Sequence, residues 1–129
     1  MAAELQLLVL ATALGIVHLG WAAAAARRQQ GLKWAAGSRD EPRPVTGLAA
    51  RLERAFRNYR ETYPFFAVAV IVAVLTDKTG GLFLTGAVIH VACRIAFLPL
   101  YAWAGGYWRA LVWIAGLAGL ILMLVALAL

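Results

Sequence analysis

The chain has 129 residues, of which 64% are hydrophobic and 14% are charged, with a net charge of +6. Such a composition is typical of a protein that crosses a membrane several times, and it argues against an ordinary soluble domain of this length. The single cysteine, Cys93, excludes an intrachain disulfide. No nucleic-acid-binding motif accompanies the positive charge, so we do not expect nucleic acid as a partner.

The first apolar run covers residues 5–27 and is long enough to span a bilayer. Glu4 precedes it and no Lys or Arg does, whereas a signal peptide begins with positive charge. We therefore expect a retained membrane helix. The polar segment that follows, residues 28–46, contains Pro42 and Pro44, which exclude a continuous helix there.

Three further helices are predicted at residues 47–76, 81–104 and 108–129. Glycine pairs at 80–81 and 105–106 separate them, because glycine is a strong helix breaker. The prediction is an all-α fold: one membrane-embedded domain, residues 1–129, built as an antiparallel four-helix bundle.

The basic residues are unevenly distributed, since nine of the twelve lie between Arg27 and Arg60. Loops rich in Lys and Arg stay on the cytoplasmic side of a membrane, so the 28–46 loop is predicted to be cytoplasmic and both termini outside. Most of this charge is expected to contact anionic lipid head groups of the bilayer. The richness in alanine and arginine favours a bacterial inner membrane.

Several polar residues are predicted to lie within the thickness of the membrane. Counting a helical rise of ~1.5 Å per residue from the outer ends of the helices places Glu61 at ~22 Å depth and Arg94 at ~20 Å. The same count places Asn58 at ~27 Å and Tyr101 at ~30 Å. An ionised side chain inside a bilayer normally has a partner. We therefore expect Glu61 and Arg94 to face each other.

The spacing of these residues predicts two polar stripes that meet near the inner third of the membrane. The two stripes consist of Arg51, Arg54, Asn58 and Glu61 on one helix, and of His90, Arg94, Phe97 and Tyr101 on the next. Arg109 would lie over them from the following loop. Guanidinium groups, an amide, a carboxylate and a phenol suit a small zwitterionic anion, such as a peptide with free carboxylates and an amine. The alternative is that these groups satisfy one another and only lock the bundle.

A metal site is not expected. His18 has no histidine, cysteine or carboxylate three or four residues away on its apolar helix, and His90 has only Cys93 at that spacing, which is too few ligands for a metal ion. Both are interpreted as core residues.

Three segments together resemble the MAPEG family, the membrane-associated proteins in eicosanoid and glutathione metabolism. They are 53-ERAFRNYRETYPFF-66, 39-RDEPRPVTG-47 and 94-RIAFLPLY-101. The chain is similar to the short bacterial-type members. This resemblance implies a homotrimer of four-helix subunits that binds glutathione as a co-substrate near the contacts between neighbours. It further implies a transferase or peroxidase that acts on a lipophilic small molecule.

The resemblance also implies roles for individual residues. Arg54, Asn58, Glu61 and Tyr101 match glutathione contacts, and Arg109 resembles an arginine that stabilises the glutathione thiolate. Arg94 is also predicted to bind glutathione, and Arg28, or its neighbour Arg27, matches a basic contact at the end of the first helix. Phe97 departs from the family, because relatives tend to place a histidine or tyrosine there. The alternative function is a non-catalytic membrane protein, structural or partner-binding, whose polar network fixes the bundle.

Overall fold

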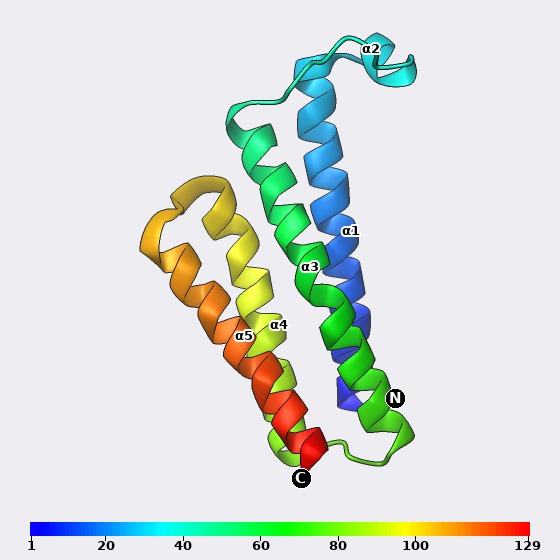
Figure 1. Cartoon of the computed structure of the whole chain (residues 1–129), viewed down its shortest axis with the longest axis vertical. Coiled ribbons are helices and arrows are strands. Elements are labelled where there is room, and N and C mark those ends of the chain that lie inside the picture. Colours follow the sequence, from blue (N-terminus) through cyan, green and yellow to red (C-terminus); the bar gives the residue numbers. More distant parts are fainter.

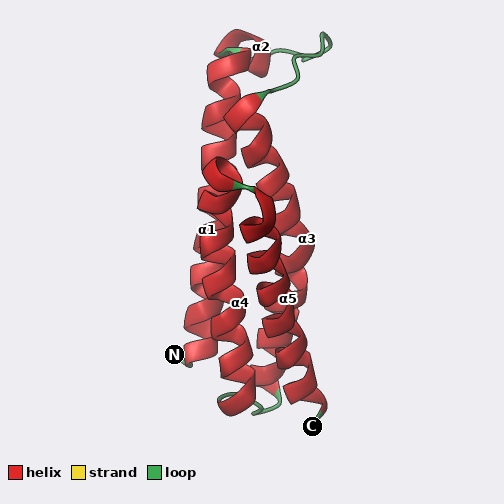
Figure 2. Cartoon of the chain, turned by 90° about the vertical axis from the view of Figure 1, so that its left-hand side faces the viewer, coloured by secondary structure: helices red, strands yellow, loops and turns green.

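The computed structural model describes residues 1–129, with the exception of the side chain of residue 104. The helical elements in chain order are α1 (Ala3–Gln30), α2 (Leu32–Ala36), α3 (Gly47–Leu75), α4 (Gly81–Pro99), the π-helical turn η1 (Leu100–Ala104) and α5 (Gly106–Ala128). The described residues contain no strand (Figure 2). The prediction of an all-helical protein is therefore confirmed.

The long helices are arranged as two pairs, α1 beside α3 and α4 beside α5 (Figure 1). Both termini lie at the same end of the bundle as the short connection between α3 and α4 (Figure 1). The segment with α2 and the turn η1 lie toward the opposite end, so the neighbouring long helices run antiparallel (Figures 1 and 2). We call the end with α2 and η1 the loop end.

Three helical segments are long and apolar enough to cross a membrane: Ala3–Gln30, Gly81–Trp103 and Gly106–Ala128. These segments support an integral membrane protein. Helix α3 has 29 residues, which is also sufficient length, but its first half carries most of its charged side chains. Its second half exposes apolar residues, including Phe65, Val68 and Ile71. The passage of α3 through the membrane therefore stays a prediction.

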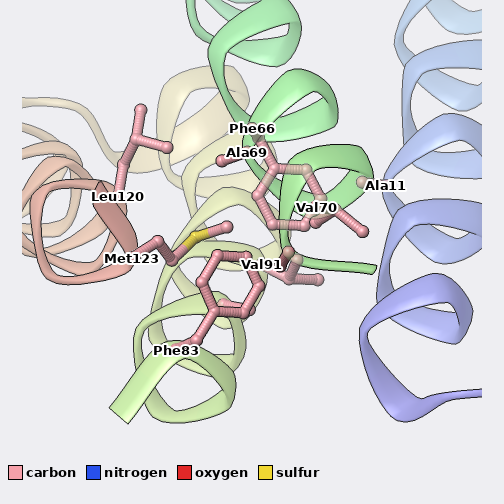
Figure 3. Close-up of a cluster of buried hydrophobic side chains, with 10 residues drawn as sticks. Ala11, Phe66, Ala69, Val70, Phe83, Val91, Leu120 and Met123 are labelled. Atoms are coloured by element: carbon pink, nitrogen blue, oxygen red, sulfur yellow. The ribbon is translucent and has the colours of Figure 1, made fainter. Parts of the chain in front are cut away.

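The main core lies in the half of the bundle nearer the termini. Figure 3 shows Phe66 and Val70 of α3 meeting Phe83 of α4 and Met123 of α5, and each of these side chains is fully buried. Helices α4 and α5 approach closely because Gly86 and Gly119 face each other without side chains. A second core cluster lies toward the loop end and is formed by Ala22, Leu52, Ala55, Phe97, Leu98 and Ala102.

The sequence predicted a regular helix over residues 81–104, but α4 ends at Pro99. After Pro99 the chain widens into η1, in which the Gly105 N–H donates to the carbonyl of Leu100 at 2.6 Å. The Arg51 Nε donates to the carbonyl of Ala102 at 2.9 Å and so ties α3 to this turn. Widened turns of this kind are frequent at functional sites. Here the turn sets the position of Tyr101.

The polar segment between α1 and α3 is held by the side chains of two glutamines. Gln29 bonds both the carbonyl and the N–H of Thr46, at 2.8 and 2.9 Å. Gln30 donates to the carbonyl of Arg43, and Arg43 donates back to the carbonyl of Gln30. These bonds fix the start of α3 against the end of α1, which sets the register of the two helices at the loop end.

Glu4 has a structural role that its position in the sequence does not reveal. Its carboxylate is buried and accepts the backbone N–H of Gly80, in the connection that precedes α4. We expect Glu4→Ala to lower the free energy of unfolding in detergent by about 1–3 kcal/mol, because the N–H loses its buried acceptor. Glu4→Gln keeps an acceptor oxygen and should lose less. Equal losses in the two variants would contradict this role.

Candidate functional site

The groove that contains three of the seven predicted site residues lies near the loop end, between α3, the end of α4 and the start of α5. Its volume is about 340 Å³, within the range of small-molecule sites. We call it the Asn58 groove; it is lined by Asn58, Phe97, Tyr101, Arg109, Ala110, Trp113 and Ile114. The structure thus brings three predicted site residues, Asn58, Tyr101 and Arg109, to one hollow.

Tyr101 lies between two arginines. The guanidinium carbon of Arg109 is 4.5 Å from the centre of the Tyr101 ring. The Tyr101 hydroxyl accepts a hydrogen bond from the Arg54 Nε at 3.3 Å. These contacts place two permanent positive charges beside the groove, since a guanidinium stays protonated. The groove therefore favours an anionic group.

Asn58 is held from within the bundle by Arg94. The Arg94 Nη1 donates to Asn58 Oδ1 at 2.8 Å, and the Arg94 side chain is only 3% exposed. Its guanidinium carbon lies 5.2 Å from the ring centre of Tyr59 and 4.5 Å from that of Phe97. Arg94 does not itself line the Asn58 groove. Aromatic faces and an amide oxygen, rather than a carboxylate, surround this buried cation.

The predicted pairing of Glu61 with Arg94 is wrong. Glu61 is exposed on α3, whereas Arg94 contacts Asn58. The physical reason is rotation about the helix: Glu61 is two residues from the buried Tyr59, or about 200° around α3, so it points away from the bundle interior. Counting the helical rise gives the depth of a residue along the helix axis. It does not give the direction of the side chain around that axis.

The basic contact predicted at the end of α1 does not belong to the Asn58 groove. Arg28 is exposed and does not line it, and neither does Arg27. Arg27 instead lines a separate groove of about 360 Å³ between α1 and α3, together with Arg57 and Arg60. Arg57 and Arg60 thus lie on a different face of α3 from Asn58, as the helical spacing predicts.

The two histidines, His90 and His18, contact a backbone carbonyl and an aromatic ring respectively. The His90 Nδ1 bonds the carbonyl of Gly116 at 2.8 Å, and His18 is buried and stacks on Tyr59 with ring centres 4.7 Å apart. Among the described residues there is no group of three or more His, Cys, Asp or Glu side chains that could hold a metal ion.

Two contributions to the site were missed from the sequence. Trp113 and Ile114 line the Asn58 groove, although Trp113 resembles a residue of an interfacial aromatic belt. A signal was available, because Trp113 is four residues from Arg109 and so shares its face of α5. Tyr59 supports Arg94, and its hydroxyl donates to the carbonyl of Ala11. Its place beside Asn58 in the sequence gives no direct hint of this role.

Comparison with known proteins gives one match. No curated protein and no solved structure matches the chain. The model of the MAPEG family matches residues 6–129, which is nearly the whole chain and includes every side chain of the Asn58 groove. The match agrees with the resemblance of the helix motifs and with the three apolar helices. The chain belongs to the MAPEG family.

Proposed function

We propose that the protein is a glutathione-dependent integral membrane enzyme, a transferase or peroxidase that acts on a lipophilic substrate. The observation that carries this proposal is the Asn58 groove, in which an amide, a phenol and a guanidinium meet at one hollow of a MAPEG-family membrane protein. Each of these groups can donate a hydrogen bond, which suits a peptide with two carboxylates.

The proposed binding roles follow from where the side chains lie. Asn58 and Tyr101 contact the tripeptide in the groove, and Arg54, which bonds Tyr101, attracts a carboxylate. Glu61 is exposed three residues from Asn58 and is available to the ammonium group. Arg28 lies outside this groove, so it is proposed to contact only the periphery of the bound glutathione. Arg94 acts behind Asn58.

The proposed chemical role of Arg109 is to stabilise the thiolate of glutathione. A thiolate is the reactive nucleophile, and a nearby cation lowers the pKa of the thiol by favouring its charged form. The thiol proton leaves to solvent. In a transferase step the sulfur forms a bond to an electrophilic carbon and displaces its leaving group. In a peroxidase step the sulfur attacks a peroxide oxygen, the O–O bond breaks, and the leaving alkoxide takes a proton to become an alcohol. The thiol of a second glutathione then attacks the resulting sulfenic acid, which gives a disulfide and releases water.

The second substrate is proposed to enter from the bilayer. Trp113 and Ile114 form the apolar side of the groove, and Ile114 is 55% exposed on α5, which is itself a candidate membrane span. A lipophilic molecule dissolved in the membrane therefore has a direct path to the site.

The proposed assembly is a homotrimer with four spans per subunit in a bacterial inner membrane, with the 28–46 loop cytoplasmic. Support comes from exposed charged residues of α3, such as Glu53 and Glu61, which are costly against lipid. A neighbouring subunit would supply polar partners for them.

One feature favours a second candidate, a non-catalytic membrane protein whose polar network fixes the bundle. The polar side chains of the site bond one another, Arg94 to Asn58 and Arg54 to Tyr101. Such pairs would stabilise the bundle without any ligand. The two candidates differ in whether a ligand adds to that stability.

The test is thermal unfolding of the detergent-purified protein in increasing concentrations of glutathione. A ligand that binds only the folded state stabilises it, by about 2.7 kcal/mol at 100 times its dissociation constant. We expect a saturable rise in melting temperature that is strongly reduced in Asn58→Ala. Arg57→Ala is the matched control, because it removes an α3 arginine outside the groove. No rise in the unchanged protein would favour the non-catalytic candidate.

A further inference from the structure

The bond between Arg94 and Asn58 fixes which atom of the amide faces the groove. A guanidinium has hydrogen-bond donors and no acceptor, so the atom of Asn58 that faces Arg94 must be the oxygen. The Asn58 side chain also lines the groove, where Arg94 is absent. With its oxygen occupied on the inner side, the amide is left with its NH2 group for the groove.

We propose that Arg94 is a positioning residue that orients the Asn58 amide, and that the ligand group bound there is a hydrogen-bond acceptor, a carboxylate or carbonyl oxygen. This inference rests on the proposed function and specifies its ligand contact. It also assigns Arg94 a role that acts through Asn58, in place of the direct contact expected from the sequence.

The surroundings of Arg94 explain why the orientation is firm. The guanidinium is enclosed by the ring faces of Tyr59 and Phe97, and it is buried. Among the described residues, its Nε and Nη2 have no hydrogen-bond partner. A rotated amide would turn NH2 toward this donor and remove the single hydrogen bond that Arg94 makes, which burial makes costly.

The orientation restricts the chemistry of the ligand. The groove presents the Asn58 NH2 and the Arg109 guanidinium, both donors only. The Tyr101 hydroxyl already accepts from Arg54, so its own proton is free for an acceptor. An ammonium group has no acceptor on Asn58 to bind. The amine of glutathione is therefore placed outside the groove, and a carboxylate or peptide carbonyl inside.

The sequence offers a direct probe, because Asn58 is the only asparagine of the chain. Labelling with ¹⁵N-asparagine gives one pair of side-chain NH2 signals in an NMR spectrum. We expect both signals to shift on addition of glutathione, saturably, at the same concentrations that raise the melting temperature. Stabilisation by glutathione without any shift of these signals would overturn the inference and leave the proposed function standing. The absence of both stabilisation and shift would remove both.

Variants separate positioning from mere stability. Asn58→Asp keeps a partner for Arg94 and removes the NH2, so we expect a folded protein with at least about tenfold weaker glutathione affinity. Arg94→Met removes the donor while keeping a long side chain, and Arg94→Lys restores a donor-only group. The ligand-induced NMR shift should fall in Arg94→Met and return in Arg94→Lys. An undiminished affinity in Asn58→Asp would contradict the inference.

Discussion

Gly119→Ala is expected to destabilise the protein by about 1–3 kcal/mol, the usual cost of forcing an extra carbon into a close-packed interior. A Cβ on Gly119 would stand 2.7 Å from the Gly86 carbonyl oxygen and 2.8 Å from the His90 nitrogen. Both are backbone atoms of α4, so no side chain can move aside and the two helices must separate. Unfolding in detergent, followed by circular dichroism, measures the change.

Gly20→Ala provides the comparison. A Cβ on Gly20 meets nothing within 4 Å, and the residue lies inside α1. Alanine is a better helix former than glycine, by about 1 kcal/mol, so this variant should be neutral or more stable. Equal behaviour of the two variants would show that α4 and α5 do not rely on the close approach of Gly86 and Gly119.

Arg109→Ala is expected to remove most of the glutathione thiolate at neutral pH while leaving measurable binding. A cation within about 4–6 Å lowers the pKa of an acidic group by about 1–3 units, so its loss lowers the thiolate fraction by about tenfold or more. Ultraviolet difference absorbance of the bound thiolate reports this fraction. Asn58 and the Arg54–Tyr101 pair remain to hold the peptide.

Arg60→Ala serves as the control for total charge. It removes one positive charge from α3 but lies in the groove between α1 and α3, away from Tyr101. Its thiolate absorbance should match that of the unchanged protein. If both variants lose thiolate equally, a general positive field, rather than Arg109, favours ionisation.

Much of the fold could be predicted because its signals are local. Apolar runs of membrane-spanning length identify an all-helical membrane protein. Breaks at Gly80 and Gly105 are also readable, since both adopt positive φ (80° and 67°), a conformation that favours glycine. The turn η1 was not predicted. It is tied to α3 by the Arg51 bond to Ala102, a contact between residues 51 positions apart that no local pattern encodes.

The candidate site was predicted in part for a related reason. Asn58 and Tyr101, whose helix stripes were predicted to meet, line one hollow together with Arg109. The spacing of Arg51, Arg54, Asn58 and Glu61 at three, four and three residues drifts by about 80° around the helix from first to last. Glu61 lies about 60° around the helix from Asn58, on the side away from the buried Tyr59, and is exposed. This rotation determines which side chain Arg94 contacts. The sequence indicates only that a buried arginine needs a partner.

The most direct measurement is a calorimetric titration of the detergent-purified protein with glutathione. We expect saturable heat with one site per subunit, an affinity at least about tenfold weaker in Asn58→Ala, and an unchanged affinity in Arg57→Ala. No heat at millimolar glutathione, or the same affinity in all three proteins, would contradict the claim that the Asn58 groove binds glutathione.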